Sequence, residues 1–200
     1  MLIKNDSKKI MEIFNDEIEK NKERCFKTGE SVLTITSKFM KYIIDDIKVI
    51  EKFECSIENK RHIYAILRVT VEELIIYKFL MNSKKNRNEL CNDFLGFNID
   101  IDKLDKSGKS DFEKLKELRG KRTTLYSNIF KKMASEFENV DGDTSLYNLY
   151  SMMADYIHNA YYEHILEEYN KEVWDGEEID MIILTILGSF LETYNKVIEN

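Results

Sequence analysis

Hydrophobic residues recur at helical spacing along most of the chain. Apolar positions three or four residues apart share one face of a helix, so this pattern predicts amphipathic helices. It predicts a first helix over residues 4–22 and a second over residues 31–53. Further helices are predicted to begin after Ser56, near Asp111, at Leu146 and near residue 178.

The pattern weakens over residues 83–110, which we predict to form an irregular loop region that can hold a short helix. A polar run begins at Asn82, and "FNIDIDKL" alternates apolar and polar residues as a short strand would. A lone strand forms no sheet. The sequence therefore predicts an all-α bundle of about six or seven helices, as a single domain over residues 1–200. Residues 1–27 can be an N-terminal helical extension of it.

Composition agrees with a helical protein. The chain has no proline and only seven glycines, and proline is the residue that most often interrupts helices. Its net charge of -7 argues mildly against a general nucleic-acid binder, although a local phosphate site stays open. The three cysteines have no zinc-ligand spacing, and no signal region or membrane-length apolar run occurs. We expect a cytoplasmic protein with no membrane segment and no cofactor.

A charge pair interrupts the most apolar helix, "RHIYAILRVTVEELIIYKFLMN". Arg68 and Glu72 are four residues apart and therefore share one face. Burying an ion pair adds little stability, because desolvation offsets much of the attraction. Two interpretations stay open: a structural network, or part of a functional site. Glu73 lies about 100° round the helix from Glu72, and we expect it to be a solvated or edge residue.

A second polar stripe lies on the helix that begins at Leu146. Ser151, Asp155, His158 and Tyr162 follow one another at spacings of four, three and four, which places them on one helix face. Asp155 can orient the imidazole of His158, as in many general acid–base catalysts. The alternative is a histidine that serves packing or an interface. The neighbouring tyrosines can stack on a base or simply pack: Tyr150, Tyr156, Tyr161 and Tyr162.

Other constellations give weaker signals. Asp155-x-x-His158 matches half of a bundle di-metal motif, but neither His62 nor His164 has an acidic residue three positions earlier, and we predict no metal site. Residues 109–122 are basic and residues 163–180 are acidic. Such runs are usually solvated faces, although they can guide a ligand or a partner.

Two of these stretches resemble one known family. "YAILRVTVEELIIYKFL" resembles a bacterial family of unknown function that is built around Arg-x-x-x-Glu in an apolar helix. "LYSMMADYIHN" is similar to that family's later Tyr-x-x-x-Ser-(Asp/Glu)-Tyr-(Val/Ile)-His pattern, with Ala154 where the family often has Ser. The resemblance covers about residues 30–170. It implies functional positions at Arg68, Glu72, Tyr150, Asp155 and His158.

The family in turn looks related to the helical HEPN superfamily. Many HEPN proteins are metal-independent ribonucleases in toxin–antitoxin, abortive-infection and CRISPR-linked defence, and many form dimers. The resemblance implies a HEPN-like fold and an RNA or nucleotide ligand. The usual nuclease signature, an arginine and a later histidine separated by four to six residues on one helix, is absent here.

Catalysis would therefore draw on two helices. His158 would act as general acid/base with Asp155 orienting it, while Arg68, positioned by Glu72, would stabilise phosphate charge. The substrate-binding residues would be Tyr150, Ser151, Asn159 and Tyr162. The competing hypothesis is a non-catalytic module, in which the same charges are structural and the protein binds a partner or dimerises.

Overall fold

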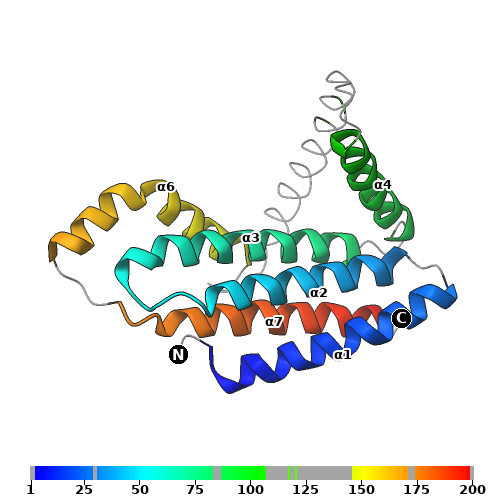
Figure 1. Cartoon of the computed structure of the whole chain (residues 1–200), viewed down its shortest axis with the longest axis horizontal. Coiled ribbons are helices and arrows are strands. Elements are labelled where there is room, and N and C mark those ends of the chain that lie inside the picture. Colours follow the sequence, from blue (N-terminus) through cyan, green and yellow to red (C-terminus); the bar gives the residue numbers. More distant parts are fainter. Residues whose placement is uncertain are drawn as a thin grey trace.

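The chain folds into α-helices throughout the part that the structure describes. The computed structural model describes residues 3–28, 31–82, 87–106, 117, 120, 146–170 and 174–198. These ranges contain no strand, which confirms the all-α prediction. The helices are α1 (Asn5–Thr28), α2 (Ser31–Ile50), α3 (Ile57–Asn82), α4 (Arg87–Lys106), α6 (Leu146–Asn170) and α7 (Glu177–Ile198), shown in Figure 1.

Four of the helices form a closed bundle. Helix α1 packs against α2 and α7, and α3 packs against the same two neighbours. In Figure 1 these four helices run side by side, with α2 antiparallel to the other three. Helix α6 lies against α3 from outside the bundle, and α4 contacts α2 and α3 before it projects away. Helix α3 is therefore the element with neighbours on every side.

A chain of aromatic rings connects the helices through the core. Phe14 of α1 lies 5.1 Å from Phe190 of α7, measured between ring centroids. Phe190 stacks on Tyr77 of α3 at 4.1 Å. Phe39 of α2 lies 5.8 Å from Tyr77 and 5.8 Å from Phe94 of α4. One ring comes from each of five helices, and these ring contacts fix how α2, α3 and α4 pack against one another.

Helix α7 is long and apolar enough to cross a membrane by length and composition alone. Its apolar stripe faces the bundle: Ile179, Ile182, Ile183, Ile186, Leu187 and Phe190 are buried. Asp180 is also buried and accepts hydrogen bonds at one oxygen from the Lys4 backbone N–H at 2.8 Å and the Ser7 hydroxyl at 3.0 Å. These contacts tie α7 to the start of α1, and packing in the bundle accounts for the hydrophobicity of α7.

Two sequence predictions about helix bounds were wrong. Helix α1 continues past residue 22 to Thr28, and α4 is a helix of 20 residues where we expected an irregular region with a short helix and a loop, or a short strand. The apolar residues of α4 recur at helical spacing on a face that packs against α2 and α3: Leu90, Cys91, Phe94 and Leu95. Tertiary packing therefore overrides the local alternation. Apart from residues 117 and 120, the helix predicted over residues 111–137 lies outside the described residues.

Candidate functional site

Arg68 and Tyr150, one from each motif, meet where α3 packs against α6. The half-buried Arg68 donates a hydrogen bond from Nη1 to the Tyr150 hydroxyl at 3.1 Å. Its guanidinium carbon also lies 5.6 Å from the centre of the Tyr150 ring, a cation–π distance. Among the described side chains, Arg68 therefore has Tyr150 as its hydrogen-bond partner. No hydrogen bond or ion pair joins Arg68 to Glu72 there, so the positioning role that we expected for Glu72 is not seen.

The predicted polar stripe does occupy one side of α6, but its four residues do not all turn toward α3. Among the α6 side chains that the structure describes, Leu146, Met153 and Tyr156 are buried, and the helical period places His158 and Tyr162 on the opposite face. Asp155 and His158 are both exposed, and no hydrogen bond joins them among the described side chains. The proposed catalytic pair is therefore not assembled.

Ser151 and Asp155 line an open pocket of about 600 Å³ between α3 and α6. The other described lining residues are Lys60, Tyr64, Asn148, Met152 and Tyr156. Neither His158 nor Tyr162 is among the described lining residues, and the side chain of Asn159 lies outside what the structure describes. The seven predicted site residues whose side chains the structure describes are thus spread over several surfaces.

The cation of this pocket is neutralised within the chain. Lys60 Nζ lies 2.6 Å from Glu167 Oε1 and 4.8 Å from the centre of the Tyr156 ring. The Tyr156 hydroxyl donates to the second oxygen of Glu167 at 3.0 Å. Both charged side chains are largely buried, with 14% of Lys60 and 15% of Glu167 exposed. This arrangement holds α6 on α3 and leaves little free positive charge for an anion.

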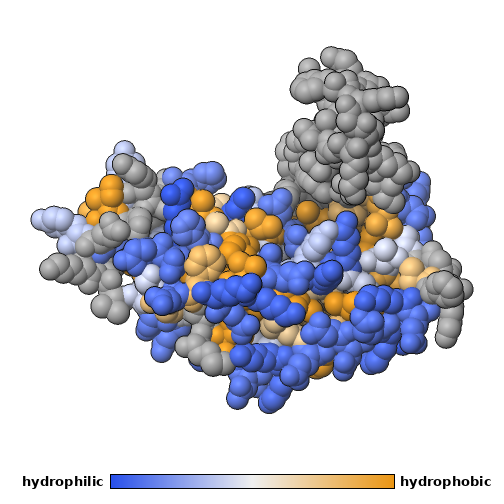
Figure 2. Space-filling model, viewed as in Figure 1, coloured by the Kyte–Doolittle hydropathy of each residue, from blue (hydrophilic) through white to orange (hydrophobic). Residues whose placement is uncertain are grey.

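The far end of α6 carries an exposed apolar face. Tyr162, Ile165, Leu166 and Tyr169 are 76%, 49%, 59% and 83% exposed. Their spacing of i, i+3, i+4 and i+7 places them on one side of the helix, opposite the side packed on α3. Figure 2 shows apolar surface at this end of the molecule. We call these four residues the α6 outer face.

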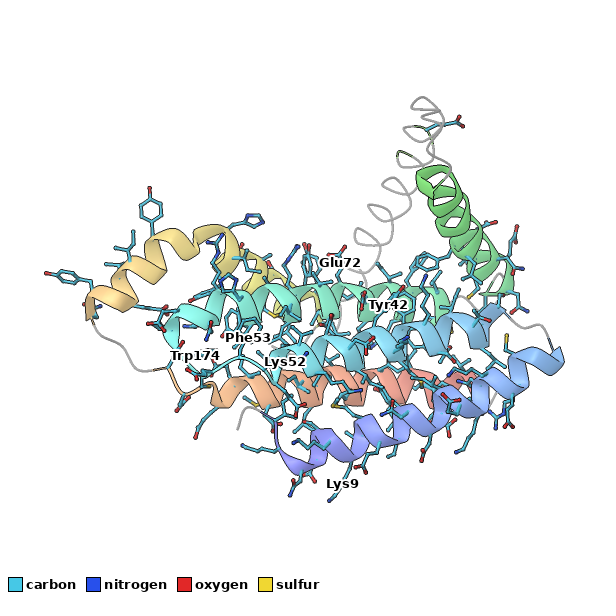
Figure 3. The ribbon with its side chains drawn as sticks, viewed as in Figure 1. Lys9, Tyr42, Lys52, Phe53, Glu72 and Trp174 are labelled. Carbon is cyan, nitrogen blue, oxygen red and sulfur yellow. The ribbon has the colours of Figure 1, made fainter. Side chains whose placement is uncertain are left out.

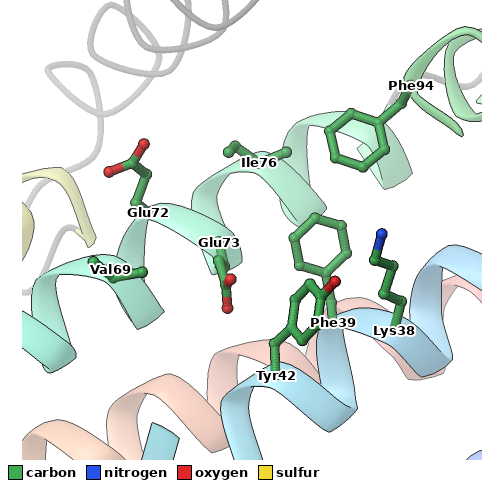
Figure 4. Close-up of a pocket in the computed structure, with 8 residues that line it drawn as sticks. All are labelled: Lys38, Phe39, Tyr42, Val69, Glu72, Glu73, Ile76 and Phe94. Carbon is green, nitrogen blue, oxygen red and sulfur yellow. The ribbon is translucent and has the colours of Figure 1, made fainter. Parts of the chain in front are cut away.

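Glu72 belongs to a different pocket, between α2 and α3. This pocket has a volume of about 340 Å³ and is lined by Lys38, Phe39, Tyr42, Val69, Glu72, Glu73, Ile76 and Phe94. Figure 4 shows the two carboxylates diverging: Glu72 points away from α2, and Glu73 points toward it. Figure 3 places Glu72 on the outer side of α3.

The expectation that Glu73 is a solvated or edge residue was wrong. Its side chain is half-buried, and its Oε2 atom is fully buried with no hydrogen-bond partner. Burial, followed by the negative charges of Asp46 and Glu72, raises the pKa of Glu73 to about 8, although Lys38 opposes this. At neutral pH this carboxyl group therefore holds a proton.

Asp46 of α2 is the neighbouring acid, and it has a partner. Its Oδ2 accepts a hydrogen bond from the Thr70 hydroxyl at 2.8 Å. Burial raises the pKa of Asp46 and Asp45 adds to the increase, whereas the Thr70 hydrogen bond lowers it. Two acids with raised pKa values thus face each other across α2 and α3, and only Glu73 has an orphan oxygen.

Sequence reasoning missed this pocket because its residues come from three helices, α2, α3 and α4. A signal did exist: Glu73 follows the buried Thr70 by three residues, and Asp46 follows Ile43 by three, so both acids lie beside buried positions. One sequence alone does not show which turn of α2 meets which turn of α3.

No family model, curated protein or solved structure matches this chain. In the part that the structure describes, no group of three or more His, Cys, Asp and Glu residues is placed to hold a metal ion. The HEPN-like resemblance therefore stays a prediction.

Proposed function

We propose that the chain is a helical interaction module that assembles with a second copy of itself through the α6 outer face. The observation that carries the proposal is the exposure of four large apolar side chains on one side of a helix that is already anchored to the bundle by its other side. Exposed apolar patches on a folded protein mark sites of association, and tyrosine is enriched in them.

The order of these residues suits a second copy. Along the chain the α6 outer face reads Tyr-x-x-Ile-Leu-x-x-Tyr, a pattern that is nearly the same in both directions. A two-fold axis perpendicular to α6 brings the two copies of the helix together antiparallel, so that Tyr162 of one copy meets Tyr169 of the other and Ile165 meets Leu166. Such pairing buries all four residues of each copy.

Charge also permits this pairing. Residues 163–180 are acidic, which would repel an identical surface. Glu167, however, is neutralised by Lys60 within its own chain. Glu167 also lies on the side of α6 that packs on α3, so it contributes little repulsion between copies.

Sedimentation of the purified protein tests the proposal. We expect a dimer at micromolar concentration, and we expect Leu166→Glu and Tyr169→Glu to weaken it by tenfold or more, since a buried unpaired charge is costly at an interface. Met181→Glu is the matched control, because Met181 is 65% exposed on α7 and should not affect dimerisation. A wild-type monomer up to about 100 µM would refute the proposal, as would full dimerisation of both folded variants.

The second candidate is the RNA or nucleotide binding that the HEPN resemblance implies. It is favoured by the contact between Arg68 and Tyr150, which joins the two motifs that carry the resemblance. RNA binding and cleavage in excess EDTA test it, with Arg68→Ala and His158→Ala as variants. Cleavage that folded His158→Ala loses would support a metal-independent ribonuclease. Failure of several RNAs to bind or be cleaved would leave the interaction module.

A further inference from the structure

The pocket between α2 and α3 has the size and walls of a small-ligand site. Its volume of about 340 Å³ lies within the range of small-molecule pockets. Phe39, Tyr42 and Phe94 supply aromatic walls, and Val69 and Ile76 supply aliphatic ones. Phe39 and Phe94 are buried and belong to the aromatic chain of the core, so these walls are preformed.

The polar groups of the pocket are mostly acidic. Glu72 and Glu73 line it, and Asp46 is close enough to Glu73 for its charge to raise the pKa of Glu73. Lys38 is the one cation among the described lining residues, and its Nζ lies over the Tyr42 ring, 5.5 Å from the centre. Asp46 has the Thr70 hydroxyl, whereas Glu73 Oε2 is buried without a hydrogen-bond partner among the described residues. A buried oxygen without a donor is costly, and a ligand that donates a hydrogen bond removes that cost.

We infer that this pocket binds a small ligand with an ammonium or guanidinium group on an apolar body, and that the cation pairs with Glu73. The apolar body lies against Phe39, Phe94 and Ile76. The face of the Tyr42 ring also attracts the ligand cation, as it attracts the Lys38 ammonium that lies over it at a cation–π distance. An anion is disfavoured because Glu72 and Asp46 outnumber Lys38 even while Glu73 is protonated.

Binding exchanges a proton for the ligand cation. Glu73 is protonated at neutral pH, because burial and neighbouring acids raise its pKa to about 8. A bound cation stabilises the carboxylate, so Glu73 releases its proton to solvent as the ligand enters. The charged groups around it are Lys38, Asp45 and Asp46 of α2 and Glu72 of α3; α4 contributes Phe94 to the lining. Affinity should therefore rise with pH up to about 8.

Isothermal titration of the full chain with 2-phenylethylammonium tests the inference, with neutral 2-phenylethanol and anionic 3-phenylpropionate as matched ligands. We expect the ammonium to bind about tenfold more tightly than the alcohol, and more tightly at pH 8 than at pH 6.5. Titration in buffers of different ionisation enthalpy should detect proton release at pH 6.5. Glu73→Gln should abolish the preference for the ammonium, whereas Glu12→Gln, an exposed change on α1, should keep it.

Three results would overturn the inference. Equal binding of ammonium and alcohol would make the pocket a purely apolar cavity. Tighter binding of 3-phenylpropionate would assign the site to Lys38 instead. The third result is the absence of heat with all three probes at about 10 mM, a concentration well above the largest dissociation constant expected for such small molecules. It would exclude this ligand class. Circular dichroism of Glu73→Gln separates loss of the site from loss of the fold.

Discussion

Helix α3 presents charges to two neighbours, and the two sides differ in how these charges are satisfied. On the α6 side, Lys60 has Glu167 and the Tyr156 ring, and Arg68 has Tyr150. On the α2 side, Glu73 is packed against other acids, and its Oε2 has no donor. The charges on the α6 side are paired across the two helices, whereas the α2 side keeps a carboxyl group that the fold leaves unsatisfied.

This difference separates structural charges from candidate binding groups. A buried charge with good partners costs little and fixes the relative position of two helices, so its loss should reduce stability. A buried polar atom without a partner costs free energy in every folded molecule, and such atoms are rare unless function retains them. The first kind is tested by unfolding, the second by titration and ligand binding.

Lys60→Met should give the largest loss of stability. Methionine keeps the apolar stem against Tyr156 but leaves the largely buried Glu167 without its cation. We expect the free energy of unfolding to fall by about 2–3 kcal/mol, measured by urea denaturation. Lys196→Met is the control: its pair with Glu192 is exposed, and the expected loss is below about 0.5 kcal/mol. Equal losses in the two variants would contradict a structural role for the Lys60 pair.

Helices α3, α6 and α7 could be predicted from sequence, because each has a long run of apolar residues at helical spacing. Helix α4 could not, since its apolar stripe covers only about two turns and is followed by "FNIDIDKL". Its contacts with α2 and α3 decide its conformation. Local patterns thus predicted the helices that have long apolar periodicity of their own. They failed for α4, whose conformation depends on packing against neighbouring helices.

For the candidate site, the sequence predicted which residues share a face but not where the face points. Ser151, Asp155, His158 and Tyr162 do lie on one side of α6. Both sides of α6 carry large apolar residues, however, so periodicity does not choose which one packs on α3. Glu72 and Glu73 pose the same problem on α3, because the register of α2 decides which carboxyl group becomes buried.

Glu73→Gln should give the next largest effect, and its sign depends on pH. The pKa of Glu73 is about 8 when folded against 4.5 as the reference value, so the protonated form stabilises the fold below pH 4.5. That contribution is lost as pH rises through 8, because the unfolded chain releases the proton first. Glutamine does not titrate. The variant should therefore match wild type near pH 4.5 and exceed it by about 1–2 kcal/mol above pH 8, after allowance for solvent screening of a half-exposed group.

Urea denaturation of both proteins from pH 4.5 to 9 measures that difference. A constant gap between wild type and Glu73→Gln would mean that Glu73 ionises normally and that its burial has no energetic consequence. Saturating ligand should change the comparison again, since a cation that pairs with Glu73 stabilises wild type and not the glutamine variant.

Thr70→Val should have a smaller effect on the same side of α3. The Thr70 hydroxyl donates to Asp46 at 2.8 Å, and valine has the same shape without this donor. We expect a loss of about 1 kcal/mol, because Asp46 then lacks its hydrogen-bond donor. Asp46→Asn in the Thr70→Val background should lose less than the two single changes summed, if the pair acts as a unit. Additive losses would show that Thr70 acts only through its own helix.

His158→Ala should have the smallest effect, and for that reason it discriminates best between the proposed functions. His158 is exposed on the side of α6 that faces away from Arg68, so its removal should change the free energy of unfolding by less than about 0.5 kcal/mol. Dimerisation should persist, because His158 precedes the α6 outer face by a full turn. Any change of RNA binding or cleavage in this folded, dimeric variant would then belong to His158 itself. A large loss of stability would instead place the imidazole in an interface, and the α6 outer face would have to be extended toward the start of the helix.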